Sequence, residues 1–293
     1  MWRAAFAVAA CAVALGALHL TRRPTLRIST FNIENYGSCA KHTHEPRLVE
    51  LLRDLDADVI AVQEIQDPNR FSRLVTTINA KGRRYVFQPS RCGGKHGMHV
   101  GFILDERRVH LTRTREFPEL DPDGDGLCSF GDRAGLLGSF SSDAGDFDVL
   151  VAHLKATPEG LSRRMQQWGQ ALEIKNRRRD TKRPIAIVGD MNSTGFLDDK
   201  GDEKTFIKQQ LATAGMKLPT ETLACSEYFD GKDGRPYKRS LLDHIALSDN
   251  FPIRGGAEVQ GYCRDVGCRA ELGTAPWDFV EVSDHCPVSV GER

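Results

Sequence analysis

The chain has 293 residues, 40% of them hydrophobic and 27% charged, and its 40 basic residues balance 40 acidic ones. This composition is ordinary for a soluble globular protein, and the chain is long enough to bury a substantial core. The zero net charge argues against a non-specific polyanion binder, whereas an enzyme needs only a local basic patch.

The N-terminal segment differs from the rest of the chain. Residues 4–20 (AAFAVAACAVALGALHL) carry no charge and are followed by Arg22 and Arg23. Such a stretch is typical of a secretory signal, and it is slightly short for a membrane span. We therefore expect residues 1–23 to be a signal peptide or N-terminal anchor and residues 24–293 to form the folded domain. The protein is then exported, which means periplasmic, secreted or membrane-anchored.

Short apolar runs alternate with amphipathic segments along the rest of the chain. The run over 26–33 predicts a first strand, 45–55 a helix with four leucines on one face, and 57–64 a buried strand. A helix over 69–79 precedes strands over 84–90, 99–105, 109–117, 133–140 and 147–154. A helix over 159–178, a strand over 184–190, a helix over 203–214 and strands over 241–248 and 286–290 complete the pattern. Interleaved strands and helices without an obvious linker predict one α/β domain with two packed sheets.

Seven cysteines follow the N-terminal segment, most of them in polar, glycine-rich sequence. In an oxidising compartment these positions permit disulfides. Cys263 and Cys268 are close enough in sequence to pair locally, or to staple a loop to Cys225. The alternative, a zinc site, has the wrong spacing and no accompanying histidine.

Polar residues recur where the predicted strands end or begin. Singly, each has an ordinary structural explanation, such as capping a turn or a helix. Together they are hard to explain by burial, because ionised groups at the rim of a core cost free energy unless they are paired or metal-bound. They are Asn32, Glu64, His153, Asp190, Asn192, Asp243, Asp284 and His285.

The chain resembles the endonuclease/exonuclease/phosphatase superfamily, which has the deoxyribonuclease I-like fold. The resemblance rests on TFNIEN, DVIAVQE, VAHLKA, GDMNST, LLDHI and SDHCPV, which occur in the family's order between residues 30 and 288. It implies an α/β four-layer sandwich, in which two packed mixed β-sheets are flanked by helices. It also implies hydrolysis of a phosphate ester with Mg²⁺ or Mn²⁺.

The chemistry of the residues and the resemblance together suggest their roles. Hard oxygen ligands at Asn32, Glu64 and Asp284 suit the metal ion. We expect Asp190 to orient or deprotonate the attacking water, with Asn192 holding phosphate or that carboxylate. His285, fixed by Asp243, should donate to the scissile phosphate. His153 should act on the other side of the phosphate.

Two departures from the deoxyribonuclease I pattern concern neighbouring positions. Met98 stands where those enzymes carry a glutamate paired to the histidine equivalent to His153, so the partner of His153 is unidentified. Gln66 stands where they carry an arginine for the DNA minor groove. This second departure places DNA contact in question more than phosphoester hydrolysis.

Two further segments carry weaker hypotheses. Asp121, Asp123, Asp125 and Asp132 have the spacing of a calcium-binding loop, although an acidic solvated loop is an equally simple interpretation. The basic segment from residue 163 to 183 is either a face for a nucleic-acid backbone or a solvated helix face.

These observations predict an exported, monomeric, magnesium-dependent phosphodiesterase without a protein partner. The leading hypothesis is a nuclease that cleaves DNA or RNA to 5′-phosphate ends. The alternatives are a phospholipid or phosphoinositide phosphoesterase of the same superfamily, and a non-catalytic binding protein on this fold.

Overall fold

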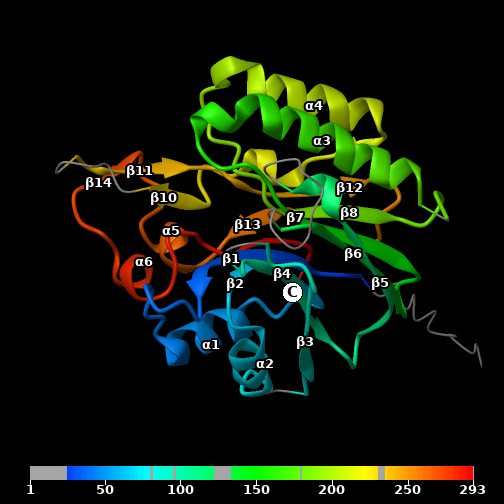
Figure 1. Ribbon diagram of the computed structural model, residues 1–293, viewed down its shortest axis with the longest axis horizontal. Coiled ribbons are helices and arrows are strands. Elements are labelled where there is room, and N and C mark those ends of the chain that lie inside the picture. Colours follow the sequence, from blue (N-terminus) through cyan, green and yellow to red (C-terminus); the bar gives the residue numbers. More distant parts are fainter. Residues whose placement is uncertain are drawn as a thin grey trace, which may run out of the picture.

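Two large β-sheets lie at the centre of the computed structural model, which describes residues 25–79, 82–94, 97–121, 133–178, 180–229 and 235–292 (Figure 1). Within these residues the first sheet has the strand order β13-β15-β1-β2-β4-β3. Only β1 and β2 run parallel, so this sheet is mixed. Its strands are Ala257–Val259 (β13), Val288–Val290 (β15), Ile28–Tyr36 (β1), Val59–Ile65 (β2), His99–Asp105 (β4) and Tyr85–Pro89 (β3).

The second sheet has the order β5-β6-β7-β8-β12-β9 and is also mixed, because β7 and β8 are parallel. Its strands are Val109–Phe117 (β5), Gly135–Ser142 (β6), Phe147–His153 (β7), Ile185–Asp190 (β8), Asp243–Ser248 (β12) and Met216–Lys217 (β9). The inner faces of the two sheets share one apolar core. Phe102 on β4 meets Phe140 on β6 edge to face, with ring centroids 5.4 Å apart.

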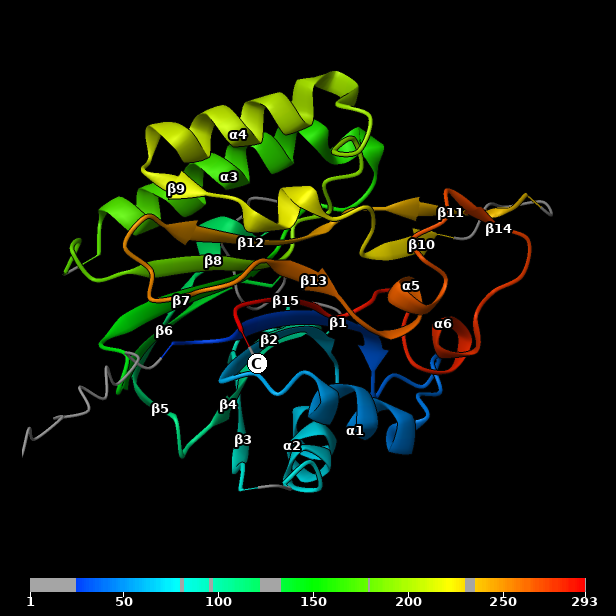
Figure 2. The same ribbon diagram turned by 180° about the vertical axis from the view of Figure 1, so that it is seen from behind.

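Helices cover the outer face of each sheet. Helices α1 (Glu45–Asp54) and α2 (Pro68–Thr76) pack on the first sheet, and α3 (Leu161–Asn176) and α4 (Glu203–Thr213) lie over the second (Figures 1 and 2). The predicted four-layer sandwich is therefore confirmed.

The sequence specifies two of these helices locally. Helix α2 begins at Pro68, and its N-cap Asp67 accepts a hydrogen bond from the Arg70 amide at 2.9 Å. In α1, the leucines at 48, 51 and 52 form the buried stripe that the sequence predicts.

A smaller third sheet and two short helices lie at one end of the sandwich (Figure 2). The sheet contains β10 (Glu227–Phe229), β11 (Tyr237–Ser240) and β14 (Glu271–Leu272), and the helices are α5 (Gly261–Asp265) and α6 (Trp277–Glu281). Sequence analysis did not predict these elements, because segments of two to five residues are too short to show a period. The described residues also contain four short 3₁₀ helices, which are Pro118–Leu120, Pro158–Gly160, Lys200–Asp202 and Pro219–Thr222.

Disulfides tie this end of the molecule together. Cys225 pairs with Cys268, and Cys263 pairs with Cys286. The staple to Cys225 is confirmed, whereas a local bridge between Cys263 and Cys268 is wrong. The Cys268 amide donates a hydrogen bond to the carbonyl of Cys263 in α5 at 2.9 Å. The backbone turn therefore joins these two residues, whereas their sulfur atoms bond to different cysteines.

The predicted N-terminal segment, residues 1–23, lies outside the described residues. Among the residues that the structure does describe, no helix combines the length and the apolar character needed to cross a membrane.

Candidate active site

Strands from both large sheets bring the predicted residues together at one edge of the sandwich. The parallel register of β7 and β8 sets His153 opposite Asp190, and the antiparallel register of β8 and β12 sets Asp190 opposite Asp243. Asn32 on β1 reaches across from the first sheet, and its Nδ2 atom lies 2.9 Å from Asp190 Oδ2 and 3.1 Å from Glu64 Oε1. One amide thus links the carboxylates of the two sheets.

The backbone at these strand ends adopts conformations that most residues avoid. Gly189 has a φ of 142°, and a Cβ atom there would lie 1.9 Å from the carbonyl oxygen of Ala152. Only glycine therefore fits directly before Asp190. Glu64 and Asn192 have φ values of 62° and 49°, which cost about 1–3 kcal/mol for a side chain of this kind. Such conformations persist where the surrounding structure fixes them, and they are concentrated at functional sites.

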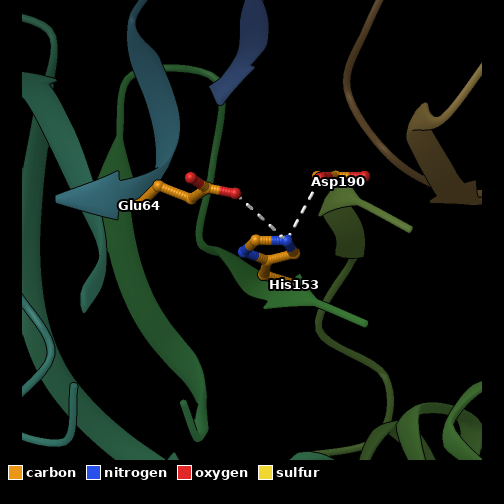
Figure 3. A group of neighbouring side chains, drawn as sticks. All are labelled: Glu64, His153 and Asp190. Carbon is orange, nitrogen blue, oxygen red and sulfur yellow. Dashed lines mark ion pairs between the residues drawn. The ribbon is translucent and has the colours of Figure 1, made fainter. Parts of the chain in front are cut away.

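Asp190 is the central hydrogen-bond acceptor of the site and is 1% exposed. Its Oδ1 atom accepts from the Asn192 amide at 2.9 Å, and its Oδ2 atom accepts from Asn192 Nδ2 at 3.2 Å. Figure 3 shows Glu64 and Asp190 on either side of the His153 ring. The His153 Nε2 atom lies 3.2 Å from Asp190 Oδ2 and 3.7 Å from Glu64 Oε1. The carboxylate of Asp190 is therefore held in one orientation.

His285 and Asp243 form a second buried pair beside Asp190. The Nδ1 atom of His285 lies 2.8 Å from Asp243 Oδ2, which leaves Nε2 pointing toward Asp190 Oδ2 at 3.7 Å. Hydroxyl groups fix the backbone on both sides. Ser226 Oγ accepts from the Asp243 amide at 3.0 Å, and Ser283 Oγ accepts from the His285 amide at 3.1 Å.

Burial and neighbouring charges set the protonation of this centre. Burial alone would raise the pKa of Asp190, but the imidazoles of His285 and His153 outweigh it and hold the pKa below the usual range. Burial would lower the pKa of His285, but the carboxylates of Asp243 and Asp190 raise the pKa well above its ordinary value. At neutral pH the centre thus contains an ionised Asp190 and a cationic His285.

Asp284 and Glu227 also lie close to His285. Ligand atoms of Glu227, Asp284 and His285 all lie within 4.8 Å of one another. Burial raises the pKa of Asp284 to about 7 and that of Glu227 to about 8, although His285 opposes both shifts. A third acid, Glu34, accepts from the Asp284 amide at 3.2 Å and from Lys41 Nζ at 2.6 Å.

Sequence analysis missed Glu227 and Glu34. The available signal for Glu227 was one charged residue at the start of the segment EYF, which forms β10, and Glu227 pairs with His285 through an isolated antiparallel bridge. Glu34 lies two residues beyond Asn32 on β1. Neither residue ends a long strand, so the rule that found the other site residues did not apply.

The environment of His153 bears on the departures noted in the sequence. Its Nδ1 atom is buried and has no hydrogen-bond partner within the described chain. Met98 does not supply one, because its sulfur contacts Arg133 Nη1 at 3.5 Å. Gln66 Nε2 donates to Asn35 Oδ1 at 2.8 Å, so this side chain is engaged with the end of β1.

The donor set suits a divalent cation. Ligand atoms of Glu64, His153 and Asp190 lie within 4.8 Å of one another, and so do those of Asp190, Asp243 and His285. Buried carboxylates at such distances repel one another unless a cation or protons lie between them. Carboxylate oxygens are the ligands that Mg²⁺ and Mn²⁺ prefer. The side-chain oxygen of Asn32 accepts a hydrogen bond from the Glu34 amide at 3.1 Å.

The family follows from a comparison of the whole sequence with known families. A model described as the Endonuclease/Exonuclease/phosphatase family matches residues 29–285, which includes every strand that carries the site. The chain belongs to this family. Endonuclease/exonuclease/phosphatase proteins are phosphoesterases that generally use divalent metals, and the acidic and histidine groups described above are of the kind that binds them. No curated protein matches the sequence.

Solved structures of this family share the fold at low sequence identity. A Bacteroides vulgatus endonuclease/exonuclease/phosphatase is 18% identical, with a TM-score of 0.60 over 91% of this chain and 98% of that chain. Truncated Caenorhabditis elegans TDP2 is 13% identical, with a TM-score of 0.62 over 90% and 96% of the two chains. D. rerio TDP2, solved with a single-strand DNA product, is 15% identical, with a TM-score of 0.59 over 91% and 98%.

The two weaker sequence hypotheses have different outcomes. Asp121, the first residue of the calcium-loop pattern, is buried, whereas Asp123, Asp125 and Asp132 lie outside the described residues. Calcium binding stays a prediction.

Two arginines of the basic segment are paired with acids inside the protein, so neither interpretation holds for them, whereas Arg177 is exposed. Arg164 is 1% exposed and lies 2.7 Å from Glu203, and Arg178 lies 2.7 Å from Asp148.

Proposed function

We propose that this protein is a metal-dependent phosphodiester hydrolase, and specifically a nuclease that leaves 5′-phosphate ends. The observation that carries the proposal is the placement of an ionised, immobilised Asp190 beside the cationic His285, with 3.7 Å between Asp190 Oδ2 and His285 Nε2. One group can take a proton from water, and the other can donate to a phosphate oxygen. A purely structural core has no use for this combination.

Asp190 acts on the attacking water. Its depressed pKa keeps the carboxylate ionised, and its hydrogen bonds to Asn32 and Asn192 fix the direction of its lone pairs. A fixed acceptor lowers the entropy cost of aligning water with phosphorus. Asn192 therefore positions the carboxylate, which is one of the two roles expected for it.

The two histidines act on the phosphate. His285, held by Asp243 through Nδ1, presents Nε2–H to a non-bridging oxygen, where negative charge grows in the transition state. His153 presents Nε2 from the neighbouring strand and stabilises charge or protonates the leaving 3′-oxygen. Cleavage of the bond between phosphorus and that oxygen leaves a 5′-phosphate and a 3′-hydroxyl.

The proposed metal ligands are Glu64, Asn32 and Asp284. A divalent cation bound there supplies neutralisation of phosphate charge. Glu64 is suited to hold it, because Asn35 and Asn32 orient its carboxylate through hydrogen bonds of 3.0 and 3.1 Å. Asp284 and Glu64 are both partly exposed, whereas Asn32 is buried.

Two observations support a nucleic acid as substrate. The D. rerio TDP2 neighbour was solved with a single-strand DNA product. In addition, a groove of about 800 Å³ lies between β5 and the C-terminal end of α3, toward the end of β7 opposite His153, and Arg113, Arg115 and Arg177 line it together with Asp148 and Asp180. Arg113 and Arg115 have no carboxylate partner among the described residues, so both remain available to a phosphate backbone.

A lipid phosphoester is the second candidate, because the structure has exposed apolar side chains that the sequence did not reveal. Trp277 and Val280, one helical turn apart on α6, are 54% and 53% exposed, and Phe229 on β10 is 45% exposed. Side chains of this kind insert into the interface of a bilayer. They also provide stacking surfaces for bases, so substrate assays must decide.

We also propose that the protein is exported and acts as a monomer whose residues 24–293 form one domain. The disulfides Cys225–Cys268 and Cys263–Cys286 support export, because such bonds persist in oxidising compartments.

The test is hydrolysis by the full chain with Mg²⁺, with supercoiled plasmid and single-stranded DNA run in parallel with phosphoinositide and sphingomyelin vesicles. EDTA and the His285→Ala variant accompany every substrate. Glu271→Gln is the matched control, because it changes an exposed acid on β14. The ends of cleaved DNA are then assayed for 5′-phosphate.

Nicking that requires metal and His285 supports the nuclease. Turnover of lipid without nicking transfers the proposal to the phospholipid branch, and Trp277→Ala should then weaken binding to vesicles. Absence of turnover on all substrates would refute both and favour the non-catalytic alternative.

A further inference from the structure

Glu227 is a buried acid for which the proposed hydrolysis gives no role. Its side chain is 7% exposed, and its Oε2 atom has no hydrogen-bond partner within the described residues. A polar atom buried without a hydrogen-bond partner reduces the free energy of unfolding by about 1–3 kcal/mol when its group is neutral. The loss is larger when the group is charged. A persistent group of this kind calls for a ligand that completes it.

The surroundings of Glu227 identify the kind of ligand. Its carboxylate, the carboxylate of Asp284 and a ring nitrogen of His285 lie within 4.8 Å of one another. Because Asp243 already engages Nδ1 of His285, the nitrogen left to bind a ligand is Nε2. Two carboxylates and one imidazole that converge on one point are donors for a cation.

The charge of the whole centre also calls for a cation. When all its acids are ionised, five carboxylates face two imidazoles, so negative charge is in excess even if both imidazoles are protonated. The carboxylates belong to Glu64, Asp190, Glu227, Asp243 and Asp284, and the imidazoles to His153 and His285.

The imidazole decides between classes of cation. Mg²⁺ and Ca²⁺ prefer oxygen ligands, whereas Zn²⁺ is commonly bound by histidine together with carboxylates. We propose that Glu227, Asp284 and His285 form a second metal site, selective for a transition-metal ion such as Zn²⁺, which shares Asp284 with the proposed Mg²⁺ site but not Glu64 or Asn32.

Zn²⁺ at this site would inhibit the proposed hydrolysis, and this consequence rests on the proposed function. Binding of the ion would release the Nε2 proton of His285 to solvent and use the lone pair so freed, so the imidazole could no longer donate a hydrogen bond to a phosphate oxygen. It also occupies Asp284, which the proposed Mg²⁺ site shares. Inhibition should therefore appear at the Zn²⁺ concentrations that fill the site.

The test measures Zn²⁺ binding directly, by equilibrium dialysis of the full chain in saturating Mg²⁺. Glu227→Gln keeps the size of the side chain and removes its charge, and Glu271→Gln is the control from the same small sheet. We expect the wild type and the control to retain one Zn²⁺ per chain. The Glu227→Gln variant should bind it at least about tenfold more weakly, since loss of even an outer-shell partner costs that much.

Thermal unfolding provides a second readout. Zn²⁺ should raise the melting temperature of the wild type and the control but not that of Glu227→Gln, because only a folded site binds the ion. If Glu227→Gln fails to fold, Asp284→Asn removes another ligand and should show the same loss of binding.

Equal Zn²⁺ affinity in wild type and variant would overturn the site. These measurements use no substrate, so a protein that binds Zn²⁺ through Glu227 but hydrolyses nothing would refute the proposed function alone. If hydrolysis is found, Zn²⁺ should inhibit the wild type more strongly than Glu227→Gln, and equal inhibition would count against the site.

Discussion

His244 gives a stability prediction that does not depend on the substrate. It follows Asp243 on β12, it is fully buried, and its ring centroid lies 4.5 Å from that of Phe196. Burial lowers its pKa from 6.5 to about 3, although Asp190 opposes the shift. The unfolded chain therefore binds a proton at His244 below about pH 6.5, whereas the native protein does not until about pH 3.

The sign and size of the effect follow from this difference. Because the unfolded state binds more protons in this window, the free energy of unfolding falls as the pH falls from 6.5 toward 3. At about pH 5 the loss is about 1.5 pH units times about 1.4 kcal/mol, or about 2 kcal/mol. His244→Gln keeps a polar side chain that can accept from Thr220 Oγ1, which lies 3.2 Å from His244 Nδ1, but it cannot titrate.

The assay is urea unfolding of wild type and His244→Gln at about pH 7.5 and about pH 5. The wild type should lose about 2 kcal/mol more than the variant between these values. His110→Gln, which removes an exposed histidine from β5, is the control and should behave as the wild type does. A gap between wild type and His244→Gln that does not change with pH would refute the reasoning.

Three other changes have defined outcomes. Asp243→Asn removes the negative charge 2.8 Å from His285 Nδ1. Loss of about 4 kcal/mol of transition-state stabilisation should lower kcat/KM about 10³-fold while the fold stays intact. Activity near that of the wild type would contradict the pairing. Gly189→Ala should destabilise the protein by about 3 kcal/mol or more, seen in the melting temperature, because its Cβ would lie 1.9 Å from a carbonyl oxygen. Cys225→Ser with Cys268→Ser opens a link between residues 43 apart and should cost about 4 kcal/mol in urea unfolding; an unchanged midpoint would show that the bridge adds no stability.

Much of the fold could be predicted from the sequence, because its long elements carry clear periods. The leucine stripe of α1 and the apolar runs of β2 and β8 determine which faces are buried. Polar residues at the ends of such runs then indicated Asp190 and His153, since adjacent strands end at one edge of a sheet. The prediction that these residues meet is confirmed by the register that pairs them.

The remaining part of the site depends on tertiary contacts that have no local signature. Glu227 lies on a three-residue strand and meets His285 only through a bridge between segments 58 residues apart. Arg164 looked like a surface cation, but its partner Glu203 lies on another helix. A charged residue whose partner is distant in sequence cannot be told from a solvated one until both are placed.

The disulfide between Cys263 and Cys286 has a consequence for when the protein can work. Cys286 directly follows His285, so this covalent link lies one residue from the imidazole that we propose donates to the phosphate. A newly made chain with free thiols lacks that restraint, and its segment from Ser283 to Cys286 is held by hydrogen bonds alone. Oxidation then adds a covalent restraint one residue from the imidazole. A hydrolase built in this way would gain its full activity only after leaving the compartment in which it is made, which would spare the phosphodiesters of the cell that produces it.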